Sequence, residues 1–190
     1  MKSFVFCLLI LSISLSAYSQ KKRPGYFVLS NGDTVKGKIK LPLINPDTDY
    51  MLYNESGFVK NFNKNEILAY GYVKSDVQED YIKFKLKQFI YGMPNHGFAK
   101  YIVKGKITLF EFYWNNGKNT GTELLFSTTP GELSILFPGS LLPGFTNKKN
   151  ILKDLLADCP EAVEKIKGVI DMEKTIKLVE MYNSCNVYTN

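Results

Sequence analysis

The side chains that carry out most protein chemistry are scarce in this chain of 190 residues. Its one histidine, His96, lies in a turn-like segment, and its three cysteines are Cys7, Cys159 and Cys185. One histidine and widely spaced cysteines do not offer the close set of nitrogen and sulfur ligands that zinc requires. A Ser-His-Asp site would need His96, which we interpret as a loop residue. The sequence therefore predicts no metal site, no cofactor and no catalytic residue of these kinds.

Carboxylate chemistry is harder to exclude, because cleavage of a glycosidic bond needs only two acids from any part of a fold. Glu111 interrupts the apolar run from Leu109 to Trp114. It is either a buried general acid or a residue on the wet side of a strand, and both interpretations stay open.

Lysines occupy every second position in two strand-like segments. These lysines are Lys36, Lys38 and Lys40 in the first segment, and Lys83, Lys85 and Lys87 in the second. Alternation with apolar residues predicts strands with one wet face. If both strands share a sheet, six ammonium groups face one way and attract an anionic polymer or lipid headgroup. The alternative is that these lysines only prevent edge pairing and aid solubility.

The overall charge is mildly basic. Lys and Arg number 24 against 18 Asp and Glu, which gives a formal net charge of +6. This is less than the concentrated basic patch of a nucleic-acid-binding protein, so we expect no nucleic-acid partner.

The N-terminus has the layout of a cleavable secretory signal. Lys2 precedes an apolar run from Phe4 to Leu15, and Ala17 and Ser19 are small residues placed for cleavage before Gln20. The run is shorter than the roughly 20 residues of a membrane span, and we expect no transmembrane segment in the mature chain. We therefore expect an exported protein of the periplasm or cell envelope, or a secreted one.

The rest of the chain predicts strands first and helices last. Residues 25–137 alternate short strands with turns, beginning with a hairpin at Asn31-Gly32. After 147, apolar residues recur at helical spacing, with helix starts at Pro160 and after Asp171. We expect a signal peptide at 1–19, a β-rich domain at 20–147 and a docked helical extension at 148–190.

Cys159 and Cys185 are the two cysteines left after removal of the signal. The exported compartment is oxidising, so a disulfide is permitted. Cys159 precedes the helix that starts at Pro160, and Cys185 follows the last helix. If a short turn at 168–171 makes the two helices antiparallel, the cysteines meet at one end, and we predict a disulfide between them.

Two stretches resemble a group of exported proteins of unknown function common in Bacteroidetes. They are Gly25-Tyr26 followed by Asn31-Gly32-Asp33-Thr34 and Gly37-Lys38-Ile39, and Asp158-Cys159-Pro160 followed by Tyr182-Asn183-Ser184-Cys185. The resemblance implies export into the envelope of a Gram-negative cell and brings no catalytic residues. The hairpin and short strands expected in residues 25–73 are also similar to the pattern of a small SH3-like or Sm-like barrel. A fold of this kind does not by itself indicate a function.

We therefore predict an α+β protein, with a mostly antiparallel β region in the form of a small barrel, a sandwich or both, followed by a C-terminal helical unit. Its expected role is non-catalytic binding or support in the envelope. The partner is an anionic envelope polymer or another envelope protein. A hydrolase that uses two carboxylates on an envelope polymer is the alternative.

Overall fold

The computed structural model describes residues 22–41, 50–57, 59–86, 93–115, 117–128, 133–137 and 147–185. The predicted signal peptide at 1–19 lies outside the described residues. The chain forms two compact units, Met1–Gln78 and Glu79–Asn190, here called unit 1 and unit 2. Each unit is considered by itself.

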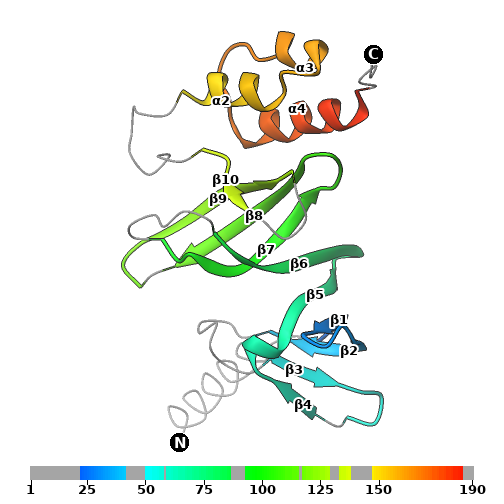
Figure 1. The fold of residues 1–190 in the computed structure, drawn as a ribbon. Coiled ribbons are helices and arrows are strands. Elements are labelled where there is room, and N and C mark those ends of the chain that lie inside the picture. The colour runs from blue at the N-terminus through cyan, green and yellow to red at the C-terminus, as the bar shows by residue number, and fades with distance from the viewer. Residues whose placement is uncertain are drawn as a thin grey trace, which may run out of the picture. The chain divides into compact units, whose positions relative to one another are not determined.

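The predicted α+β class is confirmed, with antiparallel strands first and helices at the C-terminus (Figure 1). The strands of unit 1 are β1 (Arg23–Leu29), β2 (Thr34–Lys40), β3 (Tyr50–Tyr53), β4 (Val59–Phe62) and β5 (Ile67–Lys74). The later strands are β6 (Val77–Lys85), β7 (His96–Val103), β8 (Thr108–Asn115), β9 (Thr120–Ser127) and β10 (Ser134–Ile135). The helices are η1 (Lys64–Glu66), α2 (Lys148–Leu155), α3 (Pro160–Glu164) and α4 (Met172–Ser184).

Unit 1 opens with the predicted hairpin. Gly32 has a φ of +89°, and its N–H donates to the carbonyl of Leu29 at 2.9 Å, while the Leu29 N–H donates to the Asp33 carbonyl at 2.8 Å. The loop is therefore a three-residue connection with glycine in the left-handed position. The Asn31 side chain braces this loop, because its Oδ1 accepts from the Asp33 N–H at 3.1 Å.

The strands of unit 1 curl around Phe27. Their order in the sheet is β5-β1-β2-β3-β4. Phe27 is fully buried on β1, yet its ring centroid lies 5.6 Å from that of Phe62 on β4. Three strand spacings in a flat sheet would separate β1 from β4 by about 14 Å. The sheet must therefore bend strongly, and it encloses a core of aromatic rings that also includes Tyr50 and Tyr70.

The bend brings neighbouring backbones close together at a glycine. A β-carbon added to Gly37 on β2 would lie 2.5 Å from the carbonyl oxygen of Tyr53 on β3. Gly37 pairs across the hairpin with Gly25, where an added β-carbon would lie 2.4 Å from the carbonyl oxygen of Gly71. The two glycines of the N-terminal motif are therefore needed for close strand approach.

Unit 2 is built on a sheet with two different sides. Its strand order is β10-β9-β8-β7-β6. Alternate residues of β8 face opposite sides, so Phe110, Phe112 and Trp114 join one buried cluster while Leu109 joins another. The cluster around Leu109 is the one that the C-terminal helices cover.

Helices α2, α3 and α4 pack on this side of the sheet (Figure 1). Leu152 of α2, Ala162 of α3 and Val179 of α4 are each completely buried in the same cluster as Leu109 and Leu124. The helical residues thus share a core with β7, β8 and β9. The expected boundaries of 20–147 and 148–190 remain predictions.

Local backbone geometry sets the bounds of two elements. Helix α3 ends at Glu164, because the Lys165 N–H turns back to the carbonyl of Ala162. Strand β6 begins at Val77, directly after a tight turn. The preceding turn has positive φ at Ser75 and Asp76. Ser-Asp is a weaker sequence signal for such a turn than Asn-Gly or Asp-Gly.

Candidate functional site

A row of lysines runs along the outer side of unit 1. Phe27 and Ile39 point into the core, so Lys36, Lys38 and Lys40 of β2 point outward. Successive residues on one side of a strand are about 7 Å apart. Lys36 and Lys38 are exposed and Lys40 is half-buried, which makes this side of β2 a regular line of ammonium groups.

Lys22 adds a fourth ammonium group to this side. Its Nζ lies 3.7 Å from the ring centroid of Tyr53. Lys22 adjoins the start of β1, whereas Tyr53 lies on β3 opposite Lys38. The Lys22 side chain therefore crosses over β2, held by the attraction between a cation and an aromatic face.

Half-buried side chains border the lysine row. Tyr26 of β1 lies opposite Lys36, and Met51 of β3 lies opposite Lys40. The hydroxyl of Tyr53 donates to the sulfur of Met51 at 3.5 Å. We call the surface formed by Lys22, Lys36, Lys38, Lys40, Tyr26, Met51 and Tyr53 the lysine face.

The positive charge of the lysine face is not balanced locally. Among the described residues, none of its four lysines is ion-paired with a carboxylate. The described carboxylates of unit 1 lie in the connections between strands, at Asp33, Glu55, Glu66 and Asp76. Four exposed or half-exposed like charges on one strand surface therefore make a positive potential over it.

The second lysine set lies in unit 2, in different surroundings. Lys83 is half-buried and Lys85 is exposed on β6, while Lys87 lies outside the described residues. Lys85 is opposite His96, the first residue of β7. The structure thus places Lys36, Lys38 and Lys40 in one unit and the described members of the second set in the other.

Glu79, on the same side of β6 as Lys83 and Lys85, forms an ion pair with Lys100 of β7. Glu79 is 9% exposed, and its Oε1 accepts from the Nζ of Lys100 at 2.7 Å. Its Oε2 accepts from the hydroxyl of Tyr81 at 3.1 Å. Glu111 lies directly across the strands from Lys100 and is half-buried. Lys100 therefore lies beside two carboxylates, an arrangement typical of a structural charge network.

His96 is exposed, and its Nδ1 lies 2.9 Å from the Oδ1 of Asn95. The described part of the chain contains no group of three or more His, Cys, Asp and Glu side chains that could hold a metal ion.

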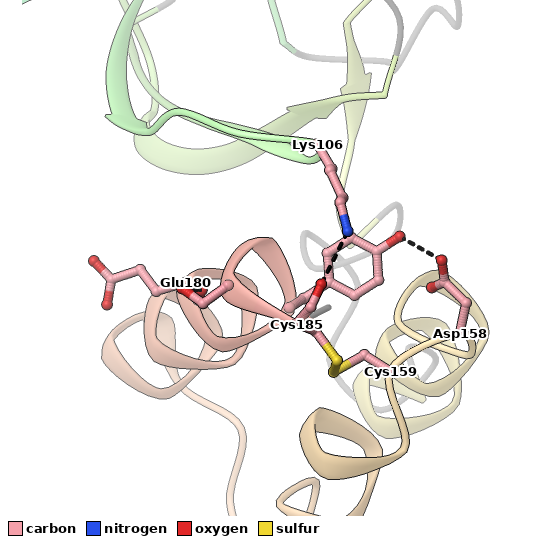
Figure 2. The surroundings of a disulfide bond; sticks show 7 residues. Lys106, Asp158, Cys159, Glu180 and Cys185 are labelled. Carbon is pink, nitrogen blue, oxygen red and sulfur yellow. Dashed lines mark hydrogen bonds between the residues drawn. A yellow bond between two sulfur atoms is a disulfide. The ribbon is translucent and has the colours of Figure 1, made fainter. Parts of the chain in front are cut away.

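The two remaining cysteines are paired at the end of α4 (Figure 2). The Cα atoms of Cys159 and Cys185 are 6.2 Å apart, which is within the range of disulfides. The prediction that these residues come within bonding distance is confirmed. Cys159 is fully buried in the core beneath the helices.

The other residues of the C-terminal motif make contacts around this disulfide. The Tyr182 hydroxyl donates to Asp158 at 3.0 Å, and Lys106 donates to the carbonyl of Cys185 at 3.0 Å (Figure 2). Asn183 binds the backbone of Ile107 twice: its Oδ1 accepts from the N–H at 2.9 Å, and its Nδ2 donates to the carbonyl at 2.8 Å. The motif therefore fixes α4 to α3 and to the turn before β8.

Burial raises the pKa of Tyr182, and the hydrogen bond to Asp158 raises it further. Both causes favour the neutral phenol, which can donate to the carboxylate.

Comparisons with family models, curated proteins and solved structures find no match to this chain. Within the described residues, no helix is long and apolar enough to cross a membrane.

Sequence reasoning found the lysine row and did not find its neighbours. Lys22 lies before the first predicted strand, and Tyr53 lies in a four-residue strand, where alternation is a weak signal. The signals available in the sequence are the basic run Lys21-Lys22-Arg23 and the short alternating segment from Tyr50 to Tyr53.

Proposed function

We propose that this chain is an exported, non-catalytic protein of the periplasm or cell envelope, with a binding or structural role. The observation that carries this proposal is the pairing of Cys159 with Cys185. Disulfides persist in oxidising compartments and are rare in the reducing cytosol. The signal-like N-terminus provides the route to such a compartment.

The contacts of the C-terminal motif support a non-catalytic role. Tyr182, Asn183 and Cys185 all bind other parts of unit 2. Side chains held in this way stabilise the fold, and reactive groups in a catalytic site must instead be available to a substrate. Both oxygens of the buried Glu79 are likewise engaged by protein donors.

The test is production of the complete chain in a Gram-negative bacterium, followed by fractionation and intact-mass measurement. We expect the protein in the periplasmic or envelope fraction, beginning at Gln20 and lighter by two hydrogens than its reduced form. Alkylation without reduction should leave Cys159 and Cys185 unmodified.

Two controls make this result specific. A variant with Leu8→Lys and Leu9→Lys should stay in the cytoplasm, because the apolar run of the signal is broken. The variant with Cys159→Ala and Cys185→Ala should be exported without the mass difference between reduced and unreduced forms. A wild-type chain that keeps Met1 and has freely alkylated Cys159 in the cytoplasm would contradict the proposal.

A further inference from the structure

We propose that the lysine face of unit 1 binds a linear, carboxylated polysaccharide lying along β2. This inference rests on the proposed function only in that an exported protein meets such polymers in the envelope. The sequence was compatible with a surface formed jointly by the lysines of residues 36–40 and those of residues 83–87. The proposed surface is instead formed by β2 and its neighbours in unit 1 alone.

The charges of the lysine face are regularly spaced. Lys36, Lys38 and Lys40 are about 7 Å apart along β2. An isolated small anion would meet one or two of these ammonium groups. A polymer with an anionic group on each sugar presents carboxylates at short, regular intervals and can contact the entire row.

The described residues do not neutralise the charge of the lysine face. Its four lysines have no carboxylate partner among these residues, and Lys22 is held over this surface by Tyr53. A side chain fixed in this way loses less conformational freedom when an anion binds than a free lysine does. The mutual repulsion of these charges is relieved by an external polyanion.

The arrangement of Lys22 over Tyr53 favours a polysaccharide over a nucleic acid. Single-stranded nucleic acids bind by stacking their bases on aromatic rings within a basic groove. Lys22 covers one face of the Tyr53 ring, at 3.7 Å from its centroid. Carbohydrate hydroxyls and carboxylates need hydrogen-bond donors instead, and the ammonium groups supply these donors.

The apolar side chains around the lysines favour a polysaccharide over a membrane surface. Proteins that lie on a bilayer insert large apolar side chains between the lipids. On the lysine face, Tyr26, Met51 and Tyr53 are half-buried. Val59 of β4, opposite Tyr53, is exposed, but it is small beside the side chains that anchor proteins in a bilayer. The lysine face therefore offers mainly charge.

The experiment measures binding of the purified protein to polygalacturonate by calorimetric titration at about 0.05 M salt, where screening is weak. We expect measurable binding that falls steeply when salt is raised to about 0.5 M. Methyl-esterified polygalacturonate has the same backbone without the charge and should not bind.

The test variant carries Lys36→Gln, Lys38→Gln and Lys40→Gln. We expect it to bind polygalacturonate about tenfold more weakly, as the sum of three exposed charge contacts. The matched control carries Lys149→Gln, Lys153→Gln and Lys165→Gln, which removes the same charge from exposed positions in α2 and directly after α3 in unit 2. Its affinity should change less than about twofold, because these lysines are not part of the lysine face.

Several outcomes would overturn the proposal. Equal weakening by the two triple variants would show that net charge alone is responsible. Tighter binding to oligothymidylate or to phosphatidylglycerol vesicles than to polygalacturonate would assign the lysine face to another partner. A backbone amide NMR titration adds a measurement without variants: perturbations outside β1, β2 and β3 would contradict the proposed location. None of these results depends on where the protein is located in the cell.

Discussion

Asn183 illustrates how one side chain fixes an element in this structure. Its amide pairs with both backbone groups of Ile107, as a neighbouring strand would do. Ile107 is buried just before β8, so its backbone groups have limited access to water. A side chain without donor and acceptor would leave both groups without this partner.

We expect Asn183→Ala to lower the free energy of unfolding by about 1–3 kcal/mol, from two lost hydrogen bonds in a partly buried site. Urea unfolding monitored by circular dichroism measures this change. The control is Ser184→Ala, at the next and exposed position, which should change stability by less than about 0.5 kcal/mol. Equal effects of the two variants would contradict the role of Asn183.

Gly37 gives a second residue-scale prediction. A β-carbon at this position would meet the Tyr53 carbonyl oxygen at 2.5 Å, and backbone cannot move aside as a flexible side chain does. We expect Gly37→Ala to destabilise unit 1 by about 1–3 kcal/mol, the usual cost of a forced shift in a packed region. Lys36→Ala, at the preceding exposed position, serves as control in the same unfolding assay. A neutral Gly37→Ala would show that the strands can separate at little cost.

At the scale of elements, we expect the junction between α3 and α4 to depend on pH. Tyr182 on α4 donates to Asp158, which precedes α3, and its pKa is raised by burial and by this hydrogen bond. The unfolded chain has an ordinary tyrosine, with a pKa of about 10. Raising pH therefore deprotonates the unfolded state first and favours unfolding.

We expect the stabilising contribution of Tyr182 to be complete below about pH 10 and to be lost as pH rises through the raised pKa of the folded state. The measurement compares wild type with Tyr182→Phe between about pH 8 and pH 11. At the lower pH the variant should be less stable by about 1 kcal/mol, the value of one hydrogen bond. The stability difference should shrink as pH rises, and a constant difference would contradict this assignment.

At the scale of the whole molecule, the disulfide acts on one of the two units. Cys159 and Cys185 are 26 residues apart, and both lie in unit 2. Closing a loop of this size stabilises a fold by about 3–4 kcal/mol in the chain-entropy model. This is a large share of the roughly 5–15 kcal/mol typical of a domain.

We expect reduction to increase hydrogen exchange in α2, α3 and α4 while β1 to β5 of unit 1 keep their protection. Mass spectrometry of proteolytic fragments, with and without reductant, measures both regions in one sample. The variant with Cys159→Ala and Cys185→Ala should show the loosened helices without reductant and no further change when it is added. Uniform loss of protection across both units would show that the disulfide stabilises the whole chain.

The sequence by itself determined the elements and the cysteine pair. Alternation of apolar and polar residues gave the strands, because successive side chains on a strand point to opposite sides. The turn at Asn31-Gly32 and the helix start at Pro160 follow from local backbone preferences. The disulfide followed from chemistry and from two antiparallel helices, which needs little knowledge of the rest of the fold.

Only the tertiary structure decided which distant residues act together. Lys22 and Tyr53 are separated by 30 residues in the sequence, and the strands of unit 1 bring the two side chains together on one surface. No local sequence pattern encodes this contact. Glu111 lies opposite Lys100 because of the register between β7 and β8, which is set by packing across the sheet. Asn183 and Ile107 likewise meet through the docking of α4, a contact made by residues 76 positions apart. Long-range contacts of this kind depend on the whole chain, and so the candidate site is a property of the fold.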